Sequence, residues 1–278
     1  MIKPFLKWAG GKRVISEEIT SRLPKEIDTY YEPMVGAGAV FMKLAIQGRF
    51  NRAVINDVNA ELINVYRTIQ TDVDKLVNVL FVLQQLYQTA KRKDDYFYKV
   101  RGLEMKYLSK VQQAARMIFL NRTCHSGLYR VNKSGGFNVP FGRYPYPKIC
   151  DEETLRDVHK VLKNVTILNG DFSKAILGIR RKDAVYFDPP YWPVSDTSFT
   201  SYTANGFGSD QQKRLAKLAR KMKDFGIPVV LSNSDVPPVR RLYTGFEIDQ
   251  IMVPRRINVD AENRGKVPEV IIMSKRLT

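Results

Sequence analysis

The sequence contains few cysteines and histidines, with two of each among 278 residues. Cys124 and Cys150 form neither a disulfide framework nor a metal-ligand spacing, so we expect a reducing cytoplasm and no structural metal. No apolar run approaches the ~20 residues that a membrane span needs, and the amino terminus lacks the apolar core of a signal peptide. These absences predict a soluble cytoplasmic protein and argue against the disulfide-rich secreted and membrane classes.

Acidic residues are scarce relative to basic ones. Lys and Arg total 45 against 28 Asp and Glu, which gives a formal net charge of +17. The basic residues cluster at 91–93, 180–182, 240–241 and 255–256, beside expected turns. A general solubility charge is the alternative, but this clustering favours a polyanionic partner such as nucleic acid.

Seven short segments rich in β-branched and aromatic residues are predicted to be strands. They are Thr29 to Met34, Ala53 to Asn56, Val165 to Leu168, Ala184 to Phe187, Pro228 to Ser232, Phe246 to Val253 and Glu269 to Met273. Helical patterns fall between most of them. Ser209 and Gln212, for example, resemble a capping box ahead of an apolar face at Leu215, Leu218, Met222 and Phe225. This alternation predicts an α/β fold, a doubly wound sheet with helices on both faces.

The long gap between the second and third strands interrupts this rhythm. Residues 59 to 151 show helical spacing and then an irregular stretch. Within that stretch, Asn132 to Gly136 is a turn signal between two candidate strands, so a hairpin is expected between Cys124 and Tyr146. We therefore predict an inserted domain at 59–151 and a main domain formed by 1–58 and 152–278.

The tetrad Asp188-Pro189-Pro190-Tyr191 directly follows the apolar strand Ala184 to Phe187. It therefore lies at the carboxyl end of a strand, where open α/β sheets bind their ligands. The Asp188 carboxylate can accept a hydrogen bond from an amino group, the Pro189 carbonyl can accept a second, and Tyr191 offers a flat face for stacking. The tetrad predicts a site for an aromatic amine such as the exocyclic nitrogen of a nucleobase. An ordinary strand-to-turn exit is the alternative.

Glycines and acidic residues follow the other expected strands. Glu32 precedes the turn Gly36-Ala37-Gly38, which would let the backbone approach a ligand at a helix amino terminus. Asp57 ends the second strand, where an acidic side chain commonly binds a ribose. Asp171-Phe172 follows the third strand and could receive an adenine amino group and flank its ring. Each acid alone is more often a helix cap, but together they predict a nucleoside cofactor beside the amine site.

The chain resembles the Dam family of DNA adenine-N6 methyltransferases, which use S-adenosylmethionine as methyl donor. The resemblance spans nearly the whole length and rests on Phe5 to Lys12, Glu32 to Gly38, Asn56 to Asn59, Phe137 to Tyr144 and Asp188 to Tyr191. It implies a Rossmann-like methyltransferase sheet with an inserted target-recognition domain. It also implies that Trp8, Lys12, Asp57 and Asp188 contact the donor. An indole face suits a sulfonium cation, and a lysine could meet the donor's carboxylate or a phosphate.

An adenine amino group is paired inside duplex DNA, so the target base must be flipped out at a cost of about a few kcal/mol. The hypothesis is that the base stacks on Tyr191 while N6 hydrogen-bonds to Asp188 and the Pro189 carbonyl. The N6 lone pair then attacks the methyl group in line, without an enzyme-bound intermediate. The segment Trp192 to Phe207, rich in Ser, Thr and Tyr, is expected to be a flap over the base, with a plain surface loop as the alternative.

Basic and aromatic residues alternate in the predicted hairpin, as expected for a DNA interface. In Dam enzymes the positions matching Lys7 and Arg130 contact guanines and the position matching Leu128 contacts a thymine, so the resemblance implies GATC. The family's aromatic-plus-Asn wedge is replaced by His125-Ser126, although His125 could still insert a ring. The DNA-contacting positions expected around these are Asn138, Arg143 and Tyr144.

Two other readings compete with this one. The acceptor could be another amine, such as guanine N2 in ribosomal RNA or a protein glutamine, since similar tetrads serve those acceptors. The Trp8 motif and the hairpin between Asp57 and Asp188 argue against it. A DNA-binding module without turnover is the second alternative, and the intact Asp188, Pro189 and Tyr191 argue against that.

Overall fold

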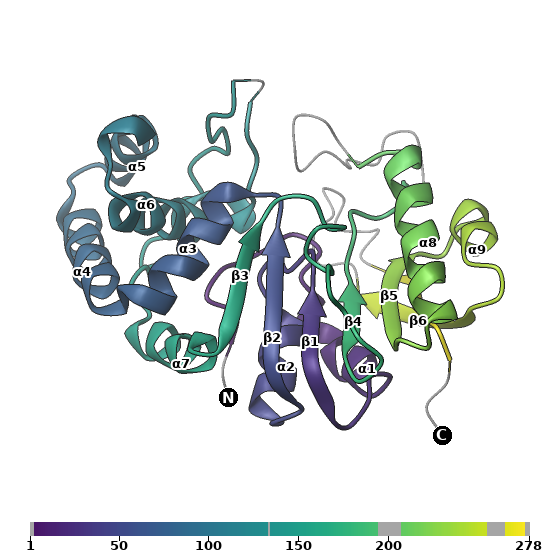
Figure 1. The fold of residues 1–278 in the computed structure, drawn as a ribbon. Coiled ribbons are helices and arrows are strands. Elements are labelled where there is room, and N and C mark those ends of the chain that lie inside the picture. The colour runs from purple at the N-terminus through teal and green to yellow at the C-terminus, as the bar shows by residue number, and fades with distance from the viewer. Residues whose placement is uncertain (1–2, 133, 194–206, 255–264, 276–278) are drawn as a thin grey trace.

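The computed structural model describes residues 3–132, 134–193, 207–254 and 265–275. Most of the predicted flap, residues 194–206, and the basic pair Arg255-Arg256 lie outside these ranges. A seven-stranded sheet with the order β3-β2-β1-β4-β5-β7-β6 forms the centre (Figure 1). All seven predicted strands are confirmed. They are β1 (Ile27–Glu32), β2 (Phe50–Asp57), β3 (Val165–Asn169), β4 (Ala184–Phe187), β5 (Val229–Ser234), β6 (Glu247–Pro254) and β7 (Lys266–Met273).

The first five strands are parallel, and β7 lies antiparallel between β5 and β6. From β1 the chain builds outward to β2 and β3, then returns to β4 on the other side of β1 and continues to β5. The strand order therefore reverses between β1 and β4. In a doubly wound sheet this reversal opens a crevice at the carboxyl ends of the two strands, which is where ligands bind. Glu32 ends β1 and Asp188 follows β4, so both border this crevice.

Nine α-helices are assigned among the described residues. They are α1 (Ser16–Thr20), α2 (Ala39–Ile46), α3 (Ala60–Thr71), α4 (Val73–Thr89), α5 (Lys93–Arg101), α6 (Lys110–Thr123), α7 (Glu152–Leu162), α8 (Ser209–Asp224) and α9 (Pro237–Leu242). Helices α3 to α7 gather at the β3 side of the sheet, whereas α8 and α9 lie at the β5 side (Figure 1). The α/β fold class is confirmed.

Two apolar clusters pack the sheet on its opposite faces. Tyr30 belongs to one cluster and the next residue, Tyr31, to the other, as expected because successive side chains of a strand point to opposite faces. The first cluster extends without a break from Ile55 in the sheet to Leu80 and Phe119 in the inserted region. The inserted region thus shares its core with the sheet, and a separate domain at 59–151 stays a prediction.

The hairpin expected between Cys124 and Tyr146 is not a regular strand pair. In the described part of this segment only two isolated bridges form, Cys124 with Phe141 and Val131 with Phe137. Pro140 lies within the bridged span and lacks the N–H that a ladder needs, while Pro145 and Pro147 follow it. The turn itself is present, because the Asn132 side-chain oxygen accepts from the Gly136 amide at 2.8 Å.

The capping box expected at Ser209 and Gln212 is wrong. Helix α8 does begin at Ser209, but its N-cap is Gly208 and no side chain caps the helix. Gln212 is instead buried, with 1% of its surface exposed. At the other end of the helix Phe225 is 66% exposed and so does not belong to the apolar face.

Candidate active site

Asp188 is held by an ion pair with Lys12 at the carboxyl end of β4. Lys12 Nζ lies 2.8 Å from Asp188 Oδ1 and also donates to the Gly10 carbonyl at 2.5 Å. Ser232 Oγ donates to the same Oδ1 at 3.0 Å. Among the described residues, no donor reaches Asp188 Oδ2. Burial raises the pKa of Asp188, while the charge of Lys12 opposes the rise.

The Tyr191 ring is fixed at two points. Its hydroxyl donates to Glu269 Oε2 at 2.7 Å, and Lys12 Nζ lies 4.6 Å from the ring centroid. Glu269 lies on β7, and its pKa is raised by burial. Glu269 was not predicted from the sequence as a site residue, although an acidic residue directly before the apolar run Val270 to Met273 is a signal that could have identified it.

Glu32 is a second buried carboxyl group in this crevice, only 2% exposed. The Tyr30 hydroxyl donates to Glu32 Oε2 at 2.6 Å. Burial raises the pKa of Glu32 to about 8, with a further contribution from the negative charge of Asp188. This raised pKa favours the protonated form of Glu32 over the carboxylate.

This raised pKa predicts a pH dependence of stability. Because the folded protein holds the Glu32 proton more tightly than the unfolded chain does, the resulting stabilisation is complete below the usual glutamate pKa. It is lost as the pH rises toward about 8. In the wild type this proton changes the free energy of unfolding by up to about 1.4 kcal/mol per pH unit. We expect Glu32→Gln to lack this contribution. Urea unfolding of both proteins between pH 5 and pH 8 measures the difference. Two parallel curves would contradict the protonated state.

The glycine turn after β1 packs closely against Trp8. Gly36 and Gly38 have φ of +49° and +68°, a conformation that favours glycine. A Cβ atom at Gly36 would lie 3.0 Å from Trp8 Cδ1, so the indole rests directly on the backbone of the turn. The Trp8 ring stacks with the Tyr129 ring. Their centroids are 5.6 Å apart and their planes are inclined at 24° to each other. Trp8 thus links the glycine turn to the segment that carries Leu128 and Arg130.

Asp57 lies at the end of β2 and faces the same turn. Its Oδ2 accepts from the Gly36 amide at 3.0 Å, and its Oδ1 accepts from the Asn59 amide at 2.9 Å. Burial raises the pKa of Asp57, and these backbone donors oppose the rise. Each carboxylate oxygen keeps acceptor capacity for a further hydroxyl.

Asp171 and Phe172 follow β3 but are engaged by Arg214 of α8. The Arg214 guanidinium pairs with both carboxylate oxygens of Asp171 and lies 4.8 Å from the Phe172 ring centroid. Ser173 Oγ donates to Asp171 as well, at 2.5 Å. The Arg214 pairing lowers the pKa of Asp171 to about 2. Arg214, which the sequence analysis missed, therefore competes with any amino group for this carboxylate.

The expected DNA-reading residues share a support in Asn121. This buried side chain accepts from the Lys7 amide at 2.9 Å and donates to the Lys7 carbonyl at 2.7 Å. It also donates to the Gly127 carbonyl at 2.9 Å. The Lys7 ammonium lies 4.5 Å above the Tyr144 ring centroid. Asn121 was missed because an Asn near a helix end usually indicates a cap rather than a clamp.

Two residues of the segment from Cys124 to Tyr146, called the recognition segment, adopt a left-handed backbone. Ser126 has φ of +54° and Arg143 has φ of +57°, which is uncommon outside glycine and concentrates at functional sites. His125 is exposed beside Ser126. Arg130 Nε donates to Asn138 Oδ1 at 2.7 Å, so the exposed guanidinium is held in one direction.

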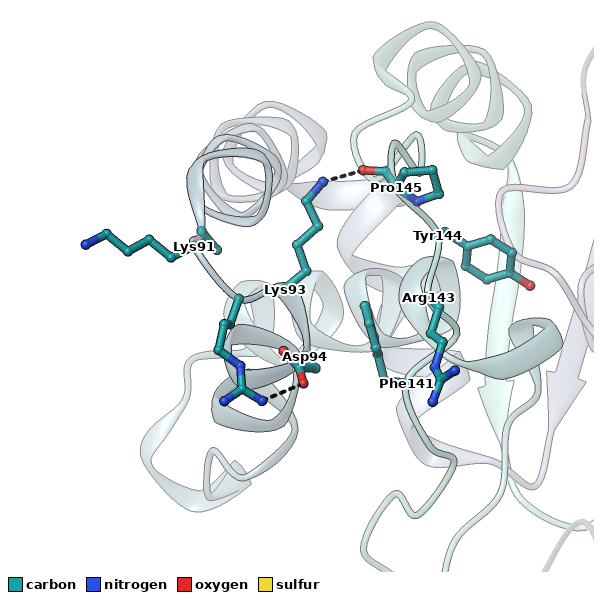
Figure 2. A pocket seen from close by; sticks show the side chains of 9 residues that line it. Lys91, Lys93, Asp94, Phe141, Arg143, Tyr144 and Pro145 are labelled. Carbon is teal, nitrogen blue, oxygen red and sulfur yellow. Dashed lines mark hydrogen bonds and ion pairs between the residues drawn. The ribbon is translucent and has the colours of Figure 1, made fainter.

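An open hollow of about 400 Å³ lies between the α4–α5 turn and the recognition segment (Figure 2). Lys93 Nζ donates across it to the Pro145 carbonyl at 2.7 Å, and Arg92 pairs with Asp94 at 3.0 Å. Lys91 extends away into solvent in Figure 2, while Arg143 lies on the opposite wall. The basic side chains around this hollow extend the positively charged surface next to Tyr144.

Two features are absent from the described ranges. No group of three or more His, Cys, Asp or Glu side chains there is arranged to hold a metal ion. None of the helices there is both long and apolar enough for a membrane span.

Comparison with known proteins shows the family that this chain matches. Residues 8–257 match the family described as D12 class N6 adenine-specific DNA methyltransferase. The chain is 43% identical to "Type II methyltransferase M.MjaIII" of Methanocaldococcus jannaschii, over 98% of this chain and 99% of that protein. It is 39% identical to "Type II methyltransferase M1.LlaDCHI" of Lactococcus lactis subsp. cremoris, covering 98% and 95%. It is 34% identical to "DNA adenine methylase" of Haemophilus influenzae, covering 97% and 92%.

Proposed function

Because this chain belongs to the D12 class of N6 adenine-specific DNA methyltransferases, we propose that it methylates a flipped-out adenine within GATC in duplex DNA, with S-adenosylmethionine as donor. The observation that carries the proposal is the tethering of Asp188. Lys12 and Ser232 both bind Oδ1, which leaves Oδ2 without a donor in the described part of the chain. A carboxylate held by one oxygen is ready to accept a substrate amino group with the other.

The residues around the crevice fit the proposed donor. Trp8 places its indole ring at the glycine turn, where an aromatic ring suits a cation. Asp57 keeps acceptor capacity for ribose hydroxyls, and the left-handed glycine turn brings backbone close to the ligand. Lys12 could meet the donor's carboxylate. Glu32 borders the same crevice, whereas adenine binding at Asp171 would require sharing with Arg214. When bound, S-adenosylmethionine supplies an electrophilic methyl group.

The tetrad would hold the target amine by its two protons. Asp188 Oδ2 accepts one, and the Pro189 carbonyl, which no donor reaches in the described ranges, accepts the other. The base stacks on the face of Tyr191 opposite Lys12, which covers the other face at 4.6 Å. The N6 lone pair forms the new carbon–nitrogen bond as the donor's sulfur–carbon bond breaks. The surplus N6 proton then passes to Asp188, whose raised pKa favours its acceptance.

Sequence choice is proposed to rest on Lys7, Leu128 and Arg130. Asn121 fixes the Lys7 backbone, and Asn138 orients the Arg130 guanidinium. An arginine presented in one direction can bind guanine O6 and N7 bidentately in the major groove. The same segment carries Arg143, Tyr144 and His125-Ser126, which would contact the DNA backbone or insert into the duplex.

The test of this proposal is labelled methyl transfer. Purified protein and tritiated S-adenosylmethionine are incubated with a duplex containing one GATC, the same duplex with GTAC, its single strand, ribosomal RNA and protein. We expect label in the GATC duplex alone and N6-methyladenine on hydrolysis. Label in the GTAC duplex at an equal rate would refute the target sequence, whereas label only in RNA or protein would refute the DNA substrate.

Arg130→Ala is expected to relax sequence choice. Losing a bidentate contact to guanine lowers discrimination by about 1–3 kcal/mol, or roughly 5–150-fold in the ratio of kcat/KM for the GATC duplex over one with that guanine replaced. Arg156→Ala on α7, where Arg156 pairs with Asp74 and Glu152, is the matched control and should keep the ratio. An unchanged ratio in Arg130→Ala would exclude direct guanine reading by this residue.

A further inference from the structure

Gln212 is a buried polar side chain on a helix whose other polar residues are mostly exposed. It is 1% exposed and lies on the inner face of α8 with Leu215 and Met222. A buried amide without partners would be costly, so its hydrogen bonds indicate its purpose. Helix capping does not account for it, because α8 has no side-chain cap at its amino end.

The Gln212 amide joins the loop of residues 188–193, which contains the tetrad, to β5. Its Nε2 donates to the Pro190 carbonyl at 2.8 Å, and its Oε1 accepts from Asn233 Nδ2 at 3.1 Å. Asn233 Oδ1 in turn accepts from the Trp192 amide at 2.9 Å, and Ser234 Oγ donates to the Trp192 carbonyl at 2.7 Å. Gln212, Asn233 and Ser234 are all buried. The backbone on either side of Tyr191 is therefore fixed from outside the tetrad.

This network determines which acceptors remain for substrate. The Pro190 and Trp192 carbonyls are occupied by Gln212 and Ser234, whereas the Pro189 carbonyl has no donor among the described residues. The prolines cannot hold the loop by their own nitrogen atoms, because neither carries an N–H. The loop consequently depends on side chains of α8 and β5 for its orientation.

We propose that Gln212 is a positioning residue for the reaction, which orients the Pro189 carbonyl and the Tyr191 ring toward the target amine by donating to the Pro190 carbonyl. This inference rests on the proposed methyl transfer. Gln212 acts through the loop backbone and does not touch the substrate. Its amide is suited to the role because it donates to one neighbour and accepts from the other at the same time.

The first test is Gln212→Met, which keeps the length of the side chain and removes its donor and acceptor. Because the Pro190 carbonyl and Asn233 lose their partner, we expect kcat to fall by about 10–100-fold. KM for the donor and the Kd for the GATC duplex should stay within about twofold, because this variant leaves the residues proposed to bind the donor and the DNA unchanged. Gln211→Met, one residue earlier on α8, is the matched control and should retain the wild-type kcat.

The second test uses protonation of a substituted side chain. Gln212→Glu can donate to the Pro190 carbonyl only while its carboxyl group is protonated, and burial raises the pKa of such a group. The ratio of its kcat to that of wild type is therefore expected to be near one at pH 6 and to fall as the pH rises to 9. A residue needed only for packing would give a ratio that does not change with pH.

Hydrogen exchange separates failure of this inference from failure of the proposed function. In the segment 188–193 three residues are prolines without amide protons, so the Trp192 amide contributes much of the signal. In Gln212→Met the amide protons of this segment should exchange at least about tenfold faster than in wild type or in Gln211→Met. Unchanged exchange together with unchanged kcat would overturn the inference. Faster exchange in a protein that methylates no DNA would refute the proposed function while still showing that Gln212 holds residues 188–193 in place.

Discussion

The Asp188→Asn protein is expected to lose methyl transfer by about 10²–10³-fold while it keeps its fold. The amide oxygen of the asparagine must remain at the Oδ1 position to accept from Lys12 and Ser232. This orientation turns the new NH₂ group to the Oδ2 position, where it presents protons to the protons of the target amine. An acceptor is thereby replaced by a donor at the one place where the reaction needs an acceptor.

Single-turnover methylation of a GATC duplex measures this effect, and circular dichroism and donor affinity verify the fold. Asp210→Asn is the matched control, since that side chain is 98% exposed on the first turn of α8 and should leave the rate unchanged. If Asp188→Asn methylated DNA within about threefold of wild type, Oδ2 could not be the acceptor for the target amine.

Gly142→Ala is expected to destabilise the recognition segment by about 3 kcal/mol. A Cβ atom there would overlap the carbonyl oxygen of Cys124 and lie 2.6 Å from Tyr144 Cε2. The turn cannot retreat, because the Gly142 amide donates to the Thr123 carbonyl at 2.9 Å. Tyr144 must therefore shift, which breaks its contact with Lys7.

Urea unfolding and duplex binding at one fixed salt concentration measure the two consequences of Gly142→Ala. We expect a lower free energy of unfolding together with weaker binding. Gly136→Ala in the same segment is the control, because its Cβ would come no closer than 3.4 Å to the Asn132 side chain and its φ is not positive. Equal stability of the two variants would show that the segment accommodates the added methyl group.

The sequence was sufficient to predict the strands and the fold class, because buried parallel strands appear as short apolar runs such as Ala184 to Phe187. It did not indicate that β7 inserts between β5 and β6, since the pairing of strands depends on contacts between distant segments. Pro140 lies within the span of the missing hairpin ladder, and its position could have argued against regular strands.

The binding residues expected at the strand ends could be proposed from the sequence, but the residues that hold them in place could not. Asp188 and Asp57 were predicted as binding residues because acidic residues at strand ends have a known chemical use. Gln212 and Asn121 were missed, since amide side chains on helices usually face solvent or cap an end. Gln212 did leave a signal, because it lies three residues before Leu215 on the apolar stripe of α8.

The adjacency of Lys7 and Trp8 means that one backbone segment, clamped by Asn121, carries the proposed guanine contact in one residue and the proposed donor contact in the next. Under the proposed function, any coupling between the two ligands through this segment is reciprocal. Cognate DNA would then change donor affinity by the same factor by which the donor changes DNA affinity.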